Sequence, residues 1–476
     1  MNVLILNSNR HMQPMTVMPV GACIVAEAAE RAGHAVRLLD LAFSKNPSRA
    51  TEEELEHHPP DLVGISVRNI DNNELHSPIE FPKEVAALTE IIRRKRAVPV
   101  VLGGAAVGLM PEALLRVTGA HWAVLNDGEA VFPKLLDALA HGRDPKGIPG
   151  VAWLEGGSFG RSPADGHVAM DECLVPDFAR WLHLKRYLSA MAVVPVQTQR
   201  GCAEKCVYCT YRFADGPGHR MAPPASVAEA VRKLASSGIR DIEFVDSVFN
   251  SPYGHAMEIC ERLAAARLGV RLHTMEMNPR PLDDALFGTM ERAGFASAAI
   301  TAESAADAAL EGLGKGYDAA TVHRVADIVA RHRIPCMWVF LLGGPGETEA
   351  TVRETLHFAQ TAIRPSDVAF FSVGIRIYPG AGIEAIARKQ GILTVPPEEM
   401  LEPVFYFSPD LDPQWLQEEV HRAVAAHPNL LGPAALHVPF VATLHRIAYR
   451  LGVRPPLWRF TRHARRLLRW TGRDLS

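Results

Sequence analysis

The first 145 residues alternate between short apolar runs and amphipathic stretches. The apolar runs have the length of buried strands and lie at 2–6, 35–40, 61–67, 98–104 and 121–127. Stretches with helical periodicity separate them, at 21–34, 80–96 and 129–142. Apolar strands that alternate with helices are typical of a doubly wound parallel sheet. Such sheets bind ligands at the carboxyl ends of their strands, and the positions there are Ser8–His11, Ser66–Asn69, Gly103–Val107 and Asp127–Glu129.

A second alternating series begins near residue 191. Six apolar strands separated by helical patterns span about 190 residues, which is too short for a standard eight-stranded barrel of about 250 residues. A capping-box signal at Ser226 and Glu229 opens one of the helices. The predicted fold is α/β, in four parts: a Rossmann-like sheet (1–145), a linker with a small hairpin (146–190), a partial (β/α)6 barrel (191–385) and a mainly helical, basic region (386–476).

The composition narrows the class of protein. Hydrophobic residues make up 48% of the chain and charged residues 22%, with a formal net charge of −3. This balance excludes a generally basic nucleic-acid binder, so no nucleic-acid partner is expected. The N-terminus lacks the basic and apolar regions of a signal peptide, and the apolar runs are too short to span a bilayer. We therefore expect a cytoplasmic protein, in which clustered cysteines indicate metal or redox chemistry rather than disulfides.

Three of the seven cysteines stand within eight residues. The stretch RGCAEKCVYCTYR places Cys202, Cys206 and Cys209 in the spacing C-x3-C-x2-C. Three thiolates on a tight loop can hold a [4Fe–4S] cluster and leave the fourth iron open for a ligand with adjacent amine and carboxylate groups. A structural zinc site or three unrelated thiols are the alternatives, but no fourth Cys or His follows Cys209 at finger spacing. The scattered cysteines are expected to be small buried hydrophobes: Cys23, Cys173, Cys260 and Cys336.

The cysteine spacing, with Tyr208 in the aromatic slot, resembles the radical S-adenosylmethionine (SAM) superfamily, and the resemblance runs through most of 190–385. DIEFVDSVFN resembles the family's second strand, which implies that Asp246 and Ser247 meet the methionine amine. ITAESAADAALEGLGKG resembles the fourth strand, which implies that Glu303 and Ser304 approach the ribose and methionine. FLLGGPGETEATVRETLHFA resembles the fifth-strand signature that flanks adenine, with Leu342 and Gly343, and IRIYPGAGI resembles the closing strand. Tyr208 belongs to the same implied SAM site.

The N-terminal sheet resembles the cobalamin-binding domain of the B12-dependent radical SAM subfamily. The segments that carry this resemblance are PDLVGISV, VVLGGAAVG and NDGEAVFPKLLDAL. It implies that the loops at Gly103, Gly104, Gly128 and Glu129 wrap the corrin and nucleotide tail, with Asn9 and Ser66 at the same crevice. The D-x-H-x-x-G motif that supplies a histidine to cobalt elsewhere is absent, and His11 does not fit it.

Arg68 follows the second strand of this sheet directly. The resemblance implies that a cation there can stand beneath a cobalt that has no protein ligand, where it would disfavour water ligation. A surface or phosphate-binding role for Arg68 is the alternative. A ligand-free lower face favours cob(I)alamin, the form that accepts a methyl group.

Together these resemblances imply a cobalamin-dependent radical SAM methyltransferase with a [4Fe–4S] cluster, SAM and cobalamin as cofactors. One SAM would methylate cobalamin, and a second would be cleaved to a 5′-deoxyadenosyl radical that activates a substrate carbon. The expected partners are a small-molecule or natural-product substrate and a reductase or flavodoxin as electron donor.

Several alternatives remain open. They are non-methylating B12 radical chemistry such as ring formation, polar methyl transfer without a radical, and a non-catalytic cobalamin sensor or iron–sulfur module. A tRNA methylthiotransferase would need a second cysteine set in the first domain, which Cys23 alone does not supply.

The C-terminus has a basic amphipathic pattern. It comprises Arg459, Arg462, Arg465, Arg466, Arg469 and Arg473 with Leu467, Leu468 and Trp470. Such a pattern can lie on an anionic membrane surface or contact an acidic substrate. A solvated helix face or a packing segment is the alternative.

Overall fold

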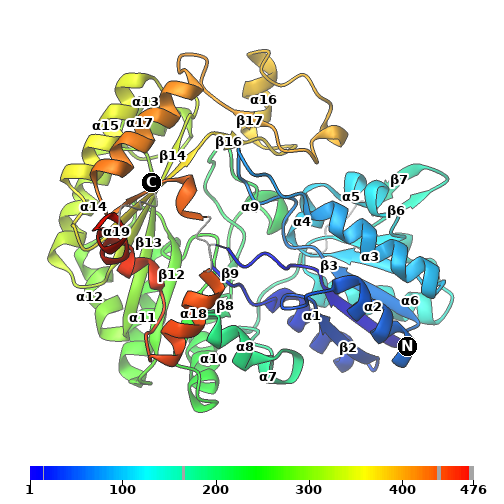
Figure 1. Cartoon of the computed structure of the whole chain (residues 1–476). Coiled ribbons are helices and arrows are strands. Elements are labelled where there is room, and N and C mark those ends of the chain that lie inside the picture. The colour runs from blue at the N-terminus through cyan, green and yellow to red at the C-terminus, as the bar shows by residue number, and fades with distance from the viewer. Residues whose placement is uncertain (14, 163–166, 437–440, 471–476) are drawn as a thin grey trace.

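The computed structural model describes residues 1–13, 15–162, 167–436 and 441–470, and describes 436, 441 and 467–470 by their backbone alone. Two sheets, each covered by helices, lie side by side (Figure 1). Within the described chain, no helix combines the length and the apolar character needed to cross a bilayer.

The first sheet has seven strands in the order β2-β1-β3-β4-β5-β6-β7. Its parallel strands are β2 (Ala35–Asp40), β1 (Asn2–Asn7), β3 (Leu62–Ser66), β4 (Val100–Gly103) and β5 (Trp122–Val124). The antiparallel hairpin β6 (Val151–Glu155) and β7 (Ser158–Arg161) extends this sheet from β5. The hairpin that the sequence placed in the linker is therefore continuous with the first sheet.

Helices cover both faces of this sheet, which explains why its central strand reads as an unbroken apolar run. Val3 and Ile5 of β1 pack with the helices on one face, and Leu4 and Leu6 pack with those on the other. The first face carries α1 (Val20–Arg31) and α6 (Gly128–Ala140). The second carries α2 (Pro47–His57), α3 (Phe81–Lys95), α4 (Ala105–Leu109) and α5 (Pro111–Thr118).

The second sheet is an open barrel of seven parallel strands, in the order β18-β15-β14-β13-β12-β11-β8. Six are the predicted barrel strands: β8 (Val194–Val196), β11 (Asp241–Phe244), β12 (Arg271–Met277), β13 (Phe295–Glu303), β14 (Cys336–Leu342) and β15 (Val368–Val373). The seventh, β18 (Leu430–Leu431), comes from the C-terminal region and pairs with β15. The helices around them are α10 (Pro224–Ser236), α11 (Tyr253–Ala266), α12 (Asp284–Ala293), α13 (Asp307–Gly312), α14 (Ala319–Arg331), α15 (Glu349–Thr361) and α17 (Pro413–Ala426).

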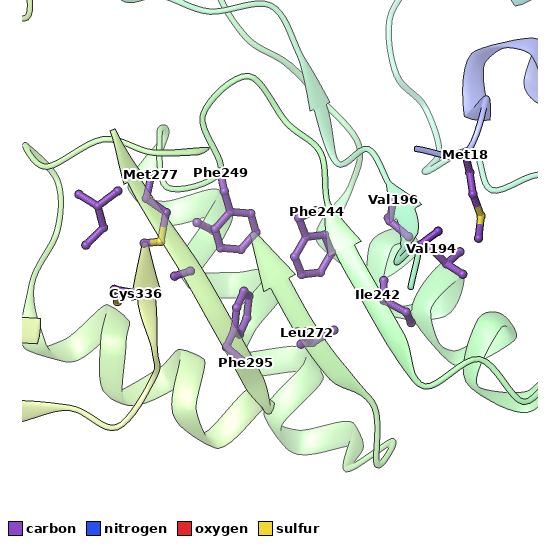
Figure 2. Close-up of a cluster of buried hydrophobic side chains, with 14 of the residues drawn as sticks. Met18, Val194, Val196, Ile242, Phe244, Phe249, Leu272, Met277, Phe295 and Cys336 are labelled. Carbon is purple, nitrogen blue, oxygen red and sulfur yellow. The ribbon is translucent and has the colours of Figure 1, made fainter. Parts of the chain in front are cut away.

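A group of three aromatic side chains packs within the largely aliphatic core of the barrel domain. Phe244, Phe249 and Phe295 pack with ring centroids 5.0 to 5.9 Å apart, and Figure 2 shows the three rings gathered near Leu272. Phe244 and Phe249 are stacked nearly parallel, at 14°. Phe244 ends β11, Phe249 lies in the loop that follows it, and Phe295 begins β13, so the rings pack β11 and its following loop against the start of β13.

The side chains of β14 alternate between buried and partly accessible, and this alternation shows which of them face the interior (lumen) of the barrel. Residues 336, 338, 340 and 342 are fully buried, whereas Met337, Val339 and Leu341 stay partly accessible. Trp338 packs against Phe358 of α15 with ring centroids 5.8 Å apart, so the buried positions face the helices. Because successive side chains of a strand point to opposite faces, the partly accessible residues line the lumen.

The remaining elements connect or close the two domains. They are α7 (Phe178–Trp181), α8 (Leu184–Ser189), β9 (Gln199–Arg200), α9 (Tyr211–Ala214), β10 (Arg220–Met221), β16 (Ile375–Arg376), α16 (Gly382–Lys389), β17 (Phe405–Tyr406), α18 (Val441–Arg450) and α19 (Thr461–Trp470).

The basic C-terminal helix α19 packs on the barrel. Arg465 is fully buried and donates to the carbonyls of Leu430 in β18, at 2.5 Å, and Val424 in α17, at 2.9 Å. Arg462 donates to the carbonyl of Pro365, at 2.9 Å. The arginine pattern of this helix is therefore not a single exposed face, since Arg465 supports the barrel edge. Arg473 lies outside the described residues.

Candidate cofactor-binding site

The cysteine loop follows β8 at the carboxyl end of the barrel and is held from two sides. The backbone N–H of Val207 donates to the carbonyl of Leu313, at 3.0 Å, and the Val207 carbonyl accepts from the N–H of Ile383, at 2.8 Å. Gly201 has a φ of 81°, and a Cβ at this position would stand 2.2 Å from the carbonyl oxygen of Gly218. The loop is thus tightly shaped, and glycine is required at its start.

The three predicted ligand thiols lie on this loop. Cys202 is buried, and Cys206 and Cys209 are partly accessible. Burial raises the pKa of all three thiols, that of Cys209 to about 12, so a metal must displace protons when it binds. In the described chain, no three Cys, His, Asp or Glu side chains meet around a point for one ion. A cluster does not require such a point, because each thiolate binds a different iron.

A polar triad joins the loop to the barrel, with Tyr208 in the loop and the buried side chains of Glu303 and Lys315 beside it. The hydroxyl of Tyr208 donates to Oε1 of Glu303, at 2.6 Å, and Nζ of Lys315 donates to the same hydroxyl, at 3.2 Å. Lys315 Nζ also lies 3.6 Å from Glu303 Oε1. Glu303 has a φ of 63°, a left-handed conformation that a residue other than glycine adopts at a cost and that is often found at functional sites. The structure therefore brings two of the predicted SAM-site residues together and adds Lys315.

The carboxylate of Asp246 is used within the protein. It accepts from Thr198 N–H at 2.6 Å, Thr198 Oγ1 at 2.7 Å and Gln199 N–H at 3.0 Å. Burial raises the pKa of Asp246 to about 6, and these bonds oppose the shift. Asp246 thus fixes the chain that leads from β8 into the cysteine loop.

Ser247 and Ser304 are also engaged internally. Ser247 Oγ lies 3.4 Å from Asp215 Oδ2, and Ser304 Oγ lies 2.9 Å from the hydroxyl of Thr355 on α15. Ser304 also accepts from the N–H of Ala306, at 3.1 Å. These hydroxyls join the loops after β11 and β13 to their surroundings.

The predicted adenine-flanking residues lie in a glycine-rich turn. The Leu342 side chain is fully buried in the core, whereas Gly343, with a φ of 100°, donates its N–H to the carboxylate of Glu347. The same carboxylate oxygen accepts from Gly344, at 3.0 Å. Glu347 Oε1 is buried without a hydrogen-bond partner among the described residues, and burial raises the pKa of Glu347 to about 7. Glu347 was not among the predicted site residues, although it lies in the quoted GGPGE stretch.

A cavity of about 200 Å³ opens at the carboxyl end of the first sheet. Five of the predicted cobalamin-site residues line it: Ser66, Gly103, Gly104, Gly128 and Glu129. A Cβ at Gly103 would meet no atom within 4 Å, so glycine leaves the backbone open to a bulky ring at this point. The cavity also reaches Ala214 at the end of α9, just beyond the cysteine loop. This combination of open glycine backbone and apolar walls fits a cobalamin tail.

Asn9 and Arg68 are not among the described residues that line this cavity. Asn9 organises the loop after β1, where its Oδ1 accepts from the N–H of His11, at 3.2 Å. Arg68 is accessible to solvent, yet the surrounding protein desolvates it enough to lower its pKa, and Tyr211 of α9 acts in the opposite direction. Arg68 is therefore close enough to α9 for its charge to act on Tyr211, two residues after Cys209.

An ion network between the domains was missed by sequence reasoning. Asp127, after β5, accepts from Arg200 of β9 at 2.9 Å and from Arg220 of β10 at 3.2 Å. Arg200 also donates to Glu129 at the start of α6, at 2.5 Å. Burial alone would raise the pKa of Asp127, but the hydrogen bonds from Arg220 and the charge of Arg200 outweigh it and lower the pKa. This network joins the lining of the cavity to both ends of the cysteine loop.

Two further carboxyl groups were missed on the barrel strands. Glu243 of β11 and Glu276 of β12 are both partly accessible. Burial raises the pKa of Glu243 to about 7 and that of Glu276 to about 8, with the charge of Glu303 adding to the second shift. Strongly perturbed carboxyl groups in such a lumen are typical of functional sites.

The cysteine loop above an open barrel, next to a cofactor cavity in a doubly wound sheet, defines a protein of the radical SAM type. The model of the Radical SAM superfamily matches residues 196–359, and the model of the B12 binding domain matches residues 14–136. The chain therefore joins a B12 binding domain to a domain of the Radical SAM superfamily.

Relatives match most of the chain. A tryptophan 2-C-methyltransferase of Streptomyces laurentii is 26% identical over 83% of this chain and 76% of its own length. An uncharacterized methyltransferase of Pyrococcus horikoshii is 25% identical over 79% of each chain. The radical SAM methyltransferase TsrM of Kitasatospora setae, solved with cobalamin and a [4Fe–4S] cluster, shares the fold with a TM-score of 0.85, at 24% identity over 99% of each chain. A second structure of TsrM holds tryptophan and a SAM analog.

Proposed function

We propose that this protein is a cobalamin-dependent methyltransferase that moves a methyl group from SAM to a carbon atom of a small molecule. The observation that carries the proposal is a cavity that both domains line. Gly103 and Gly128 line it from the first domain, and Ala214, just after the cysteine loop, lines it from the barrel domain. Relatives that match most of the chain are methyltransferases, which supports the same reaction class. When bound, cobalamin supplies a methyl carrier and the cluster supplies an electron for SAM cleavage.

The residues of the chain bind and orient these groups. Cys202, Cys206 and Cys209 would hold three irons of the cluster. Glu303, positioned by Tyr208 and Lys315, would bind a polar part of SAM at the carboxyl end of β13. The turn at Gly343 would allow close approach of the adenine, because it has no side chain.

The lumen of the barrel suggests the kind of substrate. Met337, Val339 and Leu341 provide an apolar wall, and Glu243 and Glu276 provide acceptor groups. We expect a small molecule with an apolar body and at least one hydrogen-bond donor. Tryptophan, which is bound in one structure of TsrM, fits this description.

The reaction also sets requirements outside the chain. A cluster that cleaves SAM needs a low-potential electron donor, for which a reductase or flavodoxin is the natural class. We place the reaction in the cytoplasm, where the three thiols stay reduced.

One anaerobic assay tests the proposal. Protein reconstituted with iron, sulfide and hydroxocobalamin would receive SAM, a low-potential reductant and a panel of aromatic amino acids and related amines, with products read by mass spectrometry. A methylated product with S-adenosylhomocysteine is expected, and the variant with Cys202, Cys206 and Cys209 replaced by Ala should not form it.

The by-products separate the remaining mechanisms. 5′-Deoxyadenosine together with the methylated product indicates a radical route, and S-adenosylhomocysteine alone indicates polar transfer. 5′-Deoxyadenosine without methylation of any substrate would point to ring formation or rearrangement instead. Bound cobalamin with neither SAM product across the panel would refute the enzyme assignment in favour of a sensor.

A further inference from the structure

Helix α18 exposes an apolar stripe. Leu444, Ile447 and Leu451 are 51%, 49% and 76% exposed. Their spacing of three and four residues places them on one face of the helix and of the turn that ends it. Scattered exposed leucines are ordinary, but a contiguous apolar stripe marks an interaction surface.

The opposite side of α18 anchors the helix to the protein. His445 is only 8% exposed and its ring hydrogen-bonds the carbonyl of Ala190, at the end of α8. In Figure 1, α18 lies on the outside of the barrel domain beside α8. Because one face is docked in this way, the stripe points away from the body of the molecule.

The surroundings of the stripe are basic. Residues 421–473 contain no Asp or Glu, and Arg446, Arg450 and Arg454 are exposed on or just after α18. The carboxylate of Asp241, on β11, lies 4.0 Å from the guanidinium of Arg454. The Arg454 side chain nevertheless stays 56% exposed. Arg446 hydrogen-bonds only to uncharged atoms of its own helix in the contacts observed, the Ala442 carbonyl and Thr443 Oγ1, at 3.2 and 3.3 Å.

We infer that α18 and its following turn dock the protein on an anionic phospholipid surface. The apolar stripe would enter the boundary between headgroups and acyl chains, and the three arginines would contact phosphates beside it. Self-association through the same face fits less well, because a two-fold contact would place identical arginines against one another. This inference is independent of the proposed reaction, since none of these residues touches the cofactor site.

Vesicle co-sedimentation with the full-length protein tests the inference. The probes are vesicles of phosphatidylcholine alone and vesicles with phosphatidylglycerol as about a third of the lipid. Binding to the anionic vesicles is expected, and salt should weaken it because exposed charges are screened. Neutral vesicles should bind at least tenfold more weakly.

Two variants locate the surface. Replacement of Leu444, Ile447 and Leu451 by Ser should lower the partition coefficient at least tenfold. Replacement of Arg446, Arg450 and Arg454 by Gln should lower it about a hundredfold, at about fivefold per arginine near an anionic surface. A control on the first domain, Val117→Ser with Arg93→Gln, removes an exposed apolar side chain and an exposed arginine far from α18 in the sequence, and should bind as the parent does. Circular dichroism checks that each variant is folded.

Three results would overturn the inference. These are equal binding to both vesicle types, unchanged binding by the folded α18 variants, and a dimer in light scattering that the Leu-to-Ser variant abolishes. In the third case, the stripe would be an interface between two copies of the chain. Cofactor loading is not needed for the measurement, so its outcome says nothing about the proposed reaction.

Discussion

Replacement of Asp127 by Ala is the sharpest test of the contact between the two domains. The Asp127 side chain is 4% exposed and accepts hydrogen bonds from Arg200 and Arg220 and, at 2.7 Å, from the N–H of Val168. Alanine leaves both guanidinium groups without this acceptor. The perturbation therefore acts on both ends of the cysteine loop and removes no residue that lies in it.

The free energy that the substitution costs depends on which hydrogen-bond acceptors each arginine retains. Removing one partner of a fully buried ion pair costs about 3–5 kcal/mol. Arg200 retains Glu129, and Arg220 retains the carbonyls of Val168 and Asp215, at 2.6 and 2.9 Å, with a side chain 21% exposed. We therefore expect a loss of about 2–3 kcal/mol, below the full buried-pair value.

Hydrogen exchange followed by mass spectrometry measures this loss locally, because a two-domain chain need not unfold in a single step. Protection should fall in segments 124–131 and 198–221. A double-mutant cycle with Arg220→Ala should give a coupling energy of about 1 kcal/mol or more. Asp137→Ala is the matched control on α6, since its pair with Arg143 is exposed and should contribute less than about 1 kcal/mol.

The reasoning would be refuted by an Asp127→Ala protein whose protection in both segments equals that of Asp137→Ala. A coupling energy near zero would lead to the same conclusion. In either case, the two domains would be held together by contacts other than this network.

Three further predictions concern the site. Replacing Cys202, Cys206 and Cys209 by Ala should abolish bound iron and sulfide after reconstitution, and unchanged contents would rule these thiols out as ligands. Gly201→Ala should lower cluster occupancy by at least tenfold in iron analysis, because its Cβ would collide with backbone. Burial raises the pKa of Glu347 from 4.5 to about 7, so the folded protein favours the protonated side chain. The stability that this preference contributes is full below about pH 4.5 and is lost as the pH rises through 7. In denaturant titrations above pH 7, the free energy of unfolding of Glu347→Gln should exceed that of the parent by up to about 3 kcal/mol, and the two should be equal near pH 4.5. If both proteins lost stability in parallel as the pH rises, the raised pKa of Glu347 would be refuted.

Most of the fold could be predicted from local patterns. Strands buried on both faces read as apolar runs, and the six predicted barrel strands are all present. β18 could not be predicted, because a two-residue strand has no period and depends on pairing with β15. The hairpin was recognised, but its pairing with β5 is a tertiary contact that no local pattern encodes.

In the candidate site too, some residues could be predicted from a local pattern and others depend on tertiary contacts. Cys202, Cys206 and Cys209 lie within one loop, so their spacing alone indicates a common ligand. Asp127 and Arg220 are 93 positions apart, and only the folded chain brings them together. Arg465 was expected in a basic surface pattern, yet it is buried, because the carbonyls at the edge of β18 offer it acceptors.

The network around Asp127 limits how far the chain can be treated as two exchangeable modules. A barrel transplanted from a relative would replace Arg200 and Arg220 by whatever residues that relative has there, and Asp127 on the recipient's β5–α6 loop would still need two donors. Chimeras of this family should therefore exchange residues 124–131 together with the cysteine segment, even though the two belong to different domains. Expression of either domain alone would expose, without partners, the charged side chains that form the ion network between the domains.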